Sequence, residues 1–344
     1  MDPLTTYRRQ ALAELVTLHG PRGEHPAPDF RYRSRFGRWD ERASVRVKPW
    51  PRTEQAPDDS VYFPPEHVPV LDHPLVAAKG PQVAQELLVR RLHEYLHFTV
   101  ELEQLAVIPV ASSISRGRSG LVLPAEMRAD AYKIVTDEAW HAQFSYTLQE
   151  EIAARTGVPP DDRATPAFVE RLDRVRSRLD PGLRGAEALM FAVVSETLIS
   201  AILSIIPNDR RVAPVVRQIV RDHAEDEGRH HSYFRDVLTV FWRSLSASEH
   251  VRIGRLLPEI IHAFLAPDHR ATVDALLAVG LSPTEVEQVV VESYPTAAVA
   301  EDVGRAAATT VRYLAELDAF AHVEIADAFA ASGLLHHRAY APTP

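Results

Sequence analysis

The chain has 344 residues, of which 46% are hydrophobic and 25% are charged, a balance typical of a globular protein. Its formal net charge of −9 argues against general nucleic-acid binding, which requires a basic excess. The sequence contains no cysteine, which excludes disulfides, thiolate metal sites, iron–sulfur clusters and cysteine nucleophiles. Any metal site must therefore be built from histidine, aspartate and glutamate.

The N-terminal segment shows no basic flank followed by a long apolar stretch, so the sequence predicts no secretory signal. No window reaches about 18 uninterrupted apolar residues, and we therefore expect no membrane span. Together with the lack of cysteine, these features favour a cytoplasmic location.

The first part of the chain, residues 1–80, differs in composition from the rest. We expect an N-terminal helix followed by an arm, because residues 20–80 are rich in proline, arginine and aromatic residues and lack a helical period. A short strand is expected near residues 43–47, "ASVRV". The tryptophans and tyrosines of the arm indicate that it wraps onto the body of the protein.

From residue 81 onward the apolar period is helical, with Gly157 and the run Pro207-Asn208-Asp209 as breakers. The pattern predicts one all-α domain, with a four-helix core at 81–245 and additional helices at 246–344. Helices are expected at 81–109, 124–156, 166–179, 183–206, 209–245, 247–265, 269–279, 283–291 and 295–331.

Polar residues interrupt the apolar stripes of four of these helices, at positions that a helix buries. Converging buried carboxylates are costly to ionise and repel one another. A cation removes both problems, and carboxylate oxygens combined with imidazole suit iron or manganese. The interrupting residues are Glu103 on the first helix, Glu138 and His141 on the second, Glu196 on the third, and His223, Glu227 and His230 on the fourth.

The order of these residues repeats along the chain. A lone glutamate precedes a Glu-x-x-His pair twice, at separations of 35 and 31 residues. Because Glu and His three positions apart share a helical face, both can reach one metal. The repeat is the pattern of ferritin-like di-iron and di-manganese bundles, and seven ligands are too many for one tetrahedral zinc.

Two further Glu-x-x-His pairs are expected to lie outside the metal site. The pair at 94–97 falls on the more polar face of its helix. The pair at 259–262 follows Pro258 at the start of a helix and has no suitable lone glutamate upstream. Only the repeated set therefore predicts metal binding.

The motifs resemble the p-aminobenzoate N-oxygenase family of di-iron oxygenases. The most specific feature is His223, one helical turn before Glu227, because ferritin-like oxygenases generally place two histidines at the metals and this family adds a third. The resemblance covers roughly residues 85–245 and rests on Glu103, Glu138-Ala-Trp-His141, Ser-Glu196-Thr and His223-Ala-Glu-Asp-Glu227-Gly-Arg-His230.

The resemblance implies a ferritin-like, ribonucleotide-reductase-like helical bundle that is usually a homodimer. The implied activity is oxidation of a primary, aromatic amine to a hydroxylamine, nitroso or nitro product, with O2 as co-substrate and an external electron donor. The implied setting is the biosynthesis of a secondary metabolite such as an antibiotic. The implied ligands of two iron ions, or of manganese, are Glu103, Glu138, His141, Glu196, His223, Glu227 and His230.

Other residues are candidates for supporting roles. Tyr95, two turns before Glu103, is a candidate for the substrate pocket. Arg305 and Arg312, two turns apart on the last long helix, are candidates to bind the carboxylate of an aminobenzoate. The amine can be free or attached to a carrier. Candidates to orient the ligand histidines are Asp137, Asp222, Glu225 and Asp226.

Two other functions are compatible with such a bundle. One is hydroxylation or desaturation of carbon at a di-iron or manganese–iron centre, and a His223 that points away from the metals would favour it. The other is a non-enzymatic iron-binding bundle. The long arm and the nearly 100 residues after the metal helices argue against storage and favour an enclosed substrate site.

Overall fold

The computed structural model describes residues 30–50, 60–160 and 165–335, apart from the side chains of 200–202. Within these ranges the regular secondary structure is helical, with a single isolated β-bridge between Val61 and Val212. The predicted all-α class is confirmed. The expected N-terminal helix falls in residues 1–29, outside the described residues.

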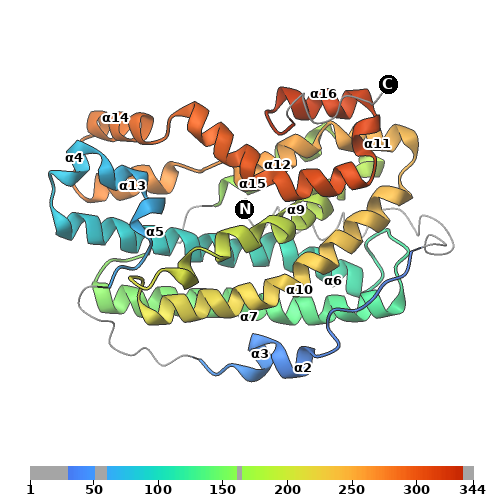
Figure 1. Ribbon diagram of the computed structural model, residues 1–344, viewed down its shortest axis with the longest axis horizontal. Coiled ribbons are helices and arrows are strands. Elements are labelled where there is room, and N and C mark those ends of the chain that lie inside the picture. The colour runs from blue at the N-terminus through green and yellow to red at the C-terminus, as the bar shows by residue number, and fades with distance from the viewer. Residues whose placement is uncertain (1–29, 51–59, 161–164, 336–344) are drawn as a thin grey trace.

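Four long helices form the central bundle and run side by side along the long axis of the molecule (Figure 1). The second ends at Gly157, whose φ of 73° lies in the left-handed region that glycine adopts at little cost. The fourth begins at Pro214, later than predicted, because residues 206–208 form a separate turn. The four are α5 (Pro81–Leu102), α7 (Ala125–Thr156), α9 (Ala186–Leu203) and α10 (Pro214–Ser244).

The first bundle helix continues past its predicted end at residue 109. A π-helical turn, η3 (Glu103–Val107), follows α5, and α6 (Ile108–Ser115) follows η3. Pro109 has no backbone N–H to donate to the carbonyl one turn earlier, and its ring crowds that carbonyl. The wider π-turn before it relieves this conflict, and such turns are frequent at functional sites. Glu103 is the first residue of the turn.

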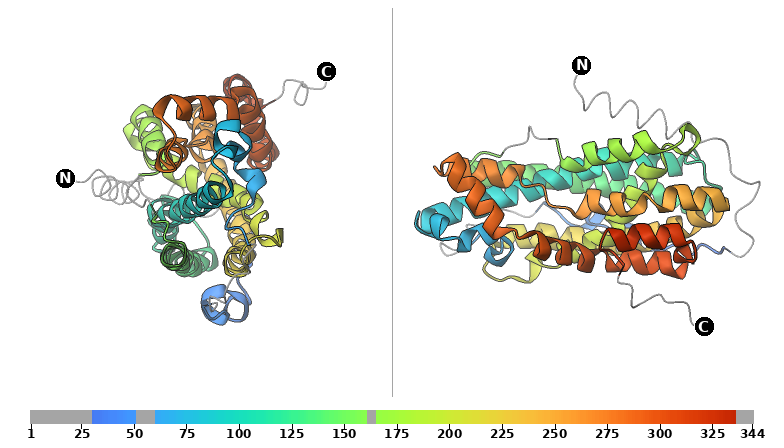
Figure 2. Two further views of the ribbon diagram at one scale, coloured as in Figure 1. Left: turned by 90° about the vertical axis from the view of Figure 1, so that its left-hand side faces the viewer. Right: turned by 90° about the horizontal axis from the view of Figure 1, so that it is seen from above.

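The C-terminal helices pack on one side of the bundle, and residues 30–50 of the arm pack on the opposite side (Figures 1 and 2). Residues 69–77 of the arm instead contact the helix at 283–293, among the C-terminal helices. Two predictions of single helices, at 247–265 and 295–331, are wrong. The first range bends before Pro258, and the second breaks at Asp318, whose φ of 56° is left-handed. The outer helices are α8 (Ala167–Arg178), α11 (Ala247–Gly254), α12 (Leu257–Leu265), α13 (Arg270–Ala278), α14 (Pro283–Ser293), α15 (Thr296–Glu316) and α16 (Val323–Ala331).

The described arm consists of short helical turns joined by extended segments. The strand expected at 43–47 is wrong, because α3 (Ser44–Val47) is a helical turn that follows α2 (Trp39–Arg42). No strand edge lies beside this segment in the described chain, so an extended conformation would leave its backbone groups unpaired. In the helical turn the Lys48 N–H donates to the Ser44 carbonyl at 3.0 Å. Further along the arm lie η1 (Pro65–His67), η2 (Pro69–Asp72) and α4 (Pro74–Ala77).

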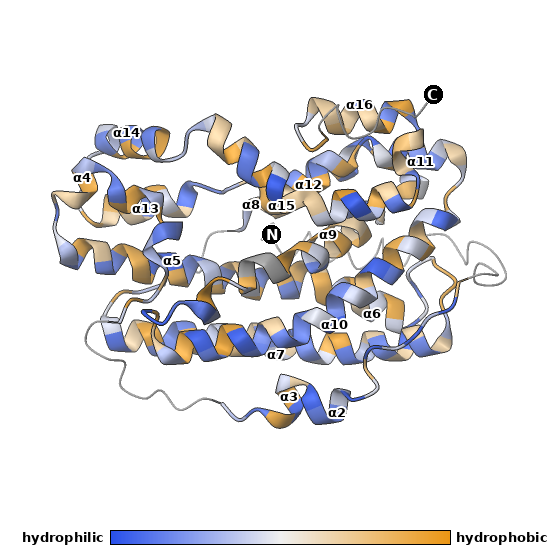
Figure 3. Cartoon of the chain, viewed as in Figure 1, coloured by the Kyte–Doolittle hydropathy of each residue, from blue (hydrophilic) through white to orange (hydrophobic). Residues whose placement is uncertain are grey.

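The helix α10 carries hydrophilic and hydrophobic residues on different faces, whereas α9 is hydrophobic nearly all round (Figure 3). In the part of the chain that the structure describes, no helix combines the length and hydropathy that crossing a bilayer requires.

Candidate metal centre

The seven predicted ligands converge in the centre of the bundle, where each side chain is at most 1% exposed. They come from η3, α7, α9 and α10. Glu103, Glu138, His141 and His223 offer ligand atoms that all lie within 4.8 Å of one another. A second such group consists of Glu138, His141, Glu227 and His230. Glu196 lies at its edge, with Oε2 3.8 Å from His230 Nδ1.

The imidazoles present defined nitrogen atoms to the centre. His141 Nδ1 lies 2.7 Å from Glu138 Oε2 and 3.4 Å from Glu227 Oε1. His230 Nδ1 lies 2.8 Å from Glu138 Oε1 and 3.2 Å from Glu227 Oε1. His223 presents Nε2, at 3.2 Å from Glu227 Oε1. Glu138 and Glu227 therefore lie between the histidines, in the position of bridging ligands.

Many of these buried atoms have no hydrogen-bond partner among the described residues. Both oxygens of Glu103 and both of Glu196 are unpartnered, as are Glu138 Oε1, Glu227 Oε2 and His223 Nε2. Glu138 Oε1 is one of them although it lies 2.8 Å from His230 Nδ1, because the two atoms are not aligned for a hydrogen bond. Buried polar atoms are otherwise almost always paired. Seven acceptor atoms that share one buried space fit cations with oxygen and nitrogen ligands.

The electrostatics of the cluster divide its glutamates into two pairs. Burial, together with the charges of Glu138 and Glu227, raises the pKa of Glu103 and that of Glu196 well above the usual range. Burial also opposes ionisation of Glu138 and Glu227, but the charge of His230 outweighs it and lowers the pKa of both. Without metal the cluster is thus stabilised by protons, which a cation would have to displace.

The histidines divide in the same way. Burial opposes protonation of His141 and His230, but the charge of Glu138 raises the pKa of both well above the usual range. Burial and the neighbouring charge of His141 lower the pKa of His223. His223 is therefore a neutral imidazole, the form in which histidine binds metals.

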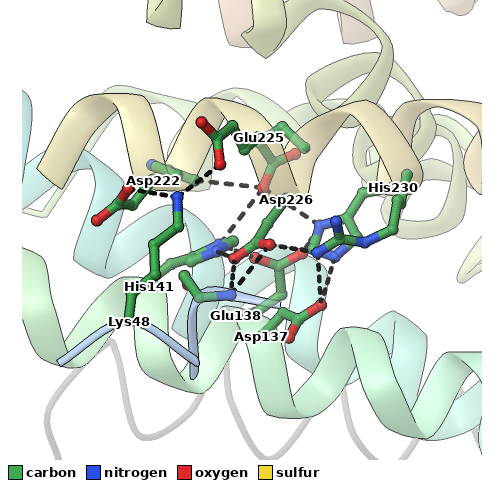
Figure 4. Close-up of polar contacts among 12 residues, drawn as sticks. Lys48, Asp137, Glu138, His141, Asp222, Glu225, Asp226 and His230 are labelled. Carbon is green, nitrogen blue, oxygen red and sulfur yellow. Dashed lines mark hydrogen bonds and ion pairs between the residues drawn. The ribbon is translucent and has the colours of Figure 1, made fainter. Parts of the chain in front are cut away.

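Two aspartates next to ligands hold the outer nitrogens of ligand histidines on the facing helix (Figure 4). Asp137 of α7 lies 3.1 Å from His230 Nε2, and Asp226 of α10 lies 3.2 Å from His141 Nε2. Each imidazole donates Nε2–H to its aspartate, which leaves Nδ1 free to bind a metal. Two of the candidate orienting residues thus contact ligand histidines.

The other two candidate orienting residues do not contact a ligand histidine. Asp222 and Glu225 instead accept from the Lys48 ammonium of the arm, at 2.6 Å and 2.5 Å. They face the arm from α10 and hold it against the bundle (Figure 4). Helical periodicity did not distinguish Asp222 and Glu225 from Asp226, because their partner, Lys48, lies in an arm without periodicity.

A cavity of about 470 Å³ lies between α5, α8, α12 and α13. Tyr95, Thr99 and Ile199 form part of its wall, and they lie within two turns of Glu103 or Glu196 on the metal-bearing helices. Its volume is in the range of small-molecule sites. The hydroxyl of Tyr95 and Nδ1 of His93 are buried at this cavity without a hydrogen-bond partner in the described chain.

The structure places the two predicted carboxylate-binding arginines elsewhere. Arg305 and Arg312 are exposed and pair with Asp302 and Glu316, and neither lines the cavity. The apolar stripe of α15 instead buries Val303, Ala307, Thr310, Val311 and Leu314. Arg305 and Arg312, seven residues apart, therefore both lie on the outer face of this helix.

The two extra Glu-x-x-His pairs lie outside the cluster of ligands. Glu94 pairs with Arg91 at 3.1 Å and, like His97, lines the cavity. Glu259 pairs with Arg178 on the surface at 2.5 Å. No local sequence pattern marks the arm residues that touch the centre, and the aromatic content of the arm indicates only that it packs on the bundle.

Comparison with known proteins identifies the family of the chain. A family model described as P-aminobenzoate N-oxygenase AurF matches residues 37–318. The chain is also similar to a 4-aminobenzoate N-oxygenase of Streptomyces thioluteus, at 26% identity over 257 residues, 72% of this chain and 75% of the relative. The predicted family is confirmed: the chain belongs to the p-aminobenzoate N-oxygenase AurF family and is an oxidoreductase of the N-oxygenase class.

Proposed function

We propose that the buried cluster holds two iron ions, or manganese, and that the protein uses O2 to oxygenate the nitrogen of a primary aromatic amine. The observation that carries the proposal is the set of carboxylate and imidazole atoms that converge without hydrogen-bond partners. The residues that would hold the ions are Glu103, Glu138, His141, Glu196, His223, Glu227 and His230.

The charges of the ligands support a pair of divalent ions. Four ionised glutamates and three neutral imidazoles carry four negative charges, which two divalent cations neutralise in a site that excludes water. Bound iron would supply the binding and activation of O2. The protein holds the ions, keeps water out and positions the amine. The inward orientation of His223 supports nitrogen oxygenation over the carbon hydroxylation alternative.

The first oxidation balances as RNH2 + O2 + 2e− + 2H+ → RNHOH + H2O. The two electrons must come from an external donor, which is part of the proposal. Further oxidation to nitroso or nitro products would use the same site. A homodimeric state, a cytoplasmic location and a role in antibiotic biosynthesis are also part of the proposal, on the strength of the family membership.

The cavity beside α5 and α9 is the proposed amine site. Three phenylalanines on its wall provide apolar contacts for an aromatic ring. The ring centroid of Phe98 lies 5.9 Å from that of Phe168 and 6.1 Å from that of Phe264. Tyr95 separates the cavity from the ligands and offers its unpartnered hydroxyl to the amine. A substrate here would lie one helical turn from Glu103 and Glu196.

The arginines of the cavity already have partners. Arg90 donates to Glu86, Arg91 pairs with Glu94, and Arg270 donates to Asp268. Arg171 donates to the Ala266 carbonyl at 2.6 Å and to other carbonyls at the end of α12. Glu86, Glu94 and Asp268 neutralise three of these four arginines, so a benzoate carboxylate would meet little net positive charge there. We therefore propose an arylamine without a carboxylate as the preferred substrate.

Two substrates of matched size test this proposal. We expect the iron-loaded, chemically reduced protein to oxygenate 4-aminobenzamide with a higher kcat/KM than 4-aminobenzoate, with products identified by mass spectrometry and 18O2 incorporation. Oxidation of carbon, or no incorporation of 18O from O2 into any arylamine tested, would overturn the proposed activity. A preference for 4-aminobenzoate would leave the activity standing and refute the proposed substrate class.

A further inference from the structure

The arm contributes donors to both aspartates that hold ligand histidines. The indole N–H of Trp39 donates to both oxygens of Asp137, each at 2.9 Å. The backbone N–H of Ser44 donates to the two oxygens of Asp226, at 3.3 Å and 3.2 Å. The two aspartates are 0% exposed, so the arm supplies contacts that water cannot replace.

The arm also packs directly on the centre. The ring of Phe36 stacks on the His230 imidazole at 6.0 Å between centroids and 18° between planes. Phe36 is 1% exposed, and its carbonyl accepts from the Lys133 ammonium at 3.3 Å. Lys48 then fixes the other end of the segment to Asp222 and Glu225 on α10. Residues 36–48 are therefore attached to the bundle at both ends and at the two aspartates between them.

Each aspartate is thus held by more than its histidine. Besides His230 and Trp39, Asp137 has Arg229 at 4.0 Å. Asp226 accepts from His141, Ser44 and Arg229. Arg229 belongs to α10, so these contacts of the two aspartates do not come from the arm. The arm donors add direction, since they fix which carboxylate lone pair faces the imidazole N–H.

We propose that residues 36–48 position two of the metal ligands from outside: Trp39 acts through Asp137 on His230, and Ser44 acts through Asp226 on His141. Docking of the arm and binding of metal are then coupled, because each stabilises the same orientation of the two imidazoles. Trp39 and Ser44 are positioning residues that touch neither metal nor substrate. The inference rests on the proposed two-metal centre.

Ser44 allows a substitution that removes the donor and also displaces the Asp226 carboxylate, because proline places Cδ where the amide hydrogen pointed at Asp226. It is the first residue of α3, where proline is well tolerated, and the preceding Ala43 has φ −64° and ψ 135°, which suits a residue before proline. Ser44→Pro deletes the N–H that Asp226 accepts. Ser44→Ala is the matched control, because it keeps the N–H and removes a hydroxyl that has no partner.

Trp39 provides an independent variant. Trp39→Phe keeps an aromatic ring and deletes the indole N–H that Asp137 accepts. Trp50→Phe is its control, because Trp50 lies on the same arm and donates in the same way, at 2.9 Å, to Glu151, which is no candidate ligand. The two pairs of variants test the two aspartates separately.

The experiment measures metal affinity and the histidine N–H signals of the full-length protein loaded with Co(II), used as a paramagnetic substitute for Fe(II). Competition with a chelator should show an affinity about 10-fold lower for Ser44→Pro and for Trp39→Phe, and unchanged for both controls. In the NMR spectrum, a different hyperfine-shifted imidazole N–H should exchange faster in each variant. Circular dichroism of the metal-free proteins checks that the helices are intact.

The outcomes separate this inference from the proposed function. If wild-type protein binds no metal, the proposed centre fails. If it binds metal and both Ser44→Pro and Trp39→Phe bind as tightly with unchanged N–H signals, the positioning role is refuted. An equal loss in the controls would also refute it, because the effect would then come from packing of the arm. Should Ser44→Pro fail to fold, Trp39→Phe against Trp50→Phe decides.

Discussion

The unpartnered carboxyls of the centre should make the metal-free protein less stable than a variant without them. Both oxygens of Glu196 are buried in the bundle and accept no hydrogen bond from the described chain. Leaving a buried polar group unpaired costs about 1–3 kcal/mol, and an apolar side chain of similar volume removes this cost and adds favourable burial. We therefore expect Glu196→Leu to stabilise the metal-free protein by about 2–4 kcal/mol.

The sign of the pH dependence follows from the same environment. Burial raises the pKa of Glu196 well above that of the unfolded chain, so its contribution to stability is fully present only below the unfolded pKa, about 4.3. That contribution is lost as the pH rises toward the folded pKa. The advantage of Glu196→Leu should therefore grow between pH 5 and pH 8.

The assay is thermal and urea unfolding of chelator-treated protein at several pH values. The expected gain corresponds to a rise in Tm of about 4–8 °C, because each kcal/mol of stability raises the Tm of a large domain by about 2 °C at least. Glu196→Gln is the control, because it keeps the volume and the unpaired polar atoms, and it should show little of the gain. A metal-free Glu196→Leu protein that is no more stable than wild type, or a Glu196→Gln protein that gains as much, would refute the reasoning.

Three further predictions follow from the site and the cavity. Metal binding should release protons, because the pKa values of Glu103, Glu196, His141 and His230 are raised without metal. Metal affinity should then rise with pH, and calorimetry in buffers of different ionisation enthalpy measures the release. Removing metal should lower the stability of wild type by about 2.7 kcal/mol per site at a free metal concentration 100 times Kd, a loss that thermal unfolding with and without chelator would reveal. Ala275→Phe narrows the cavity and should raise KM for the arylamine without changing metal content. Leu277→Phe, on the exposed side of α13, should change neither KM nor metal content. Equal KM values for the two variants would place the amine elsewhere.

The positions that meet at the centre were predictable because they obey helical periodicity. Glu138 and His141, like Glu227 and His230, are three residues apart within apolar stripes, and a stripe of that kind leaves its polar members only a buried position. The repeated order, a lone glutamate followed by a Glu-x-x-His pair, then predicted that the four helices share one site. These predictions did not depend on the contacts that Asp137 and Asp226 make with the ligand histidines.

The arm and the pocket were less predictable, for physical reasons. Trp39 and Ser44 reach aspartates 98 and 182 residues away from a segment without periodicity, so no local pattern marks them. The helical turn at 44–47 forms because no strand edge lies beside it in the described chain, a fact of tertiary structure. Arg305 and Arg312 lie on the exposed face of α15, opposite its apolar stripe, so the same periodicity that marks the ligands argues against the role that we expected for these arginines.

The central claim is that four buried glutamates and three buried histidines form a two-metal centre that oxygenates an amine. The most direct measurement loads the protein anaerobically with Fe(II), counts the bound iron, and then exposes it to 18O2 with an arylamine in a single turnover. We expect about two irons per chain and 18O attached to the amine nitrogen. Binding of one iron or none, or an arylamine recovered without 18O on its nitrogen, would contradict it.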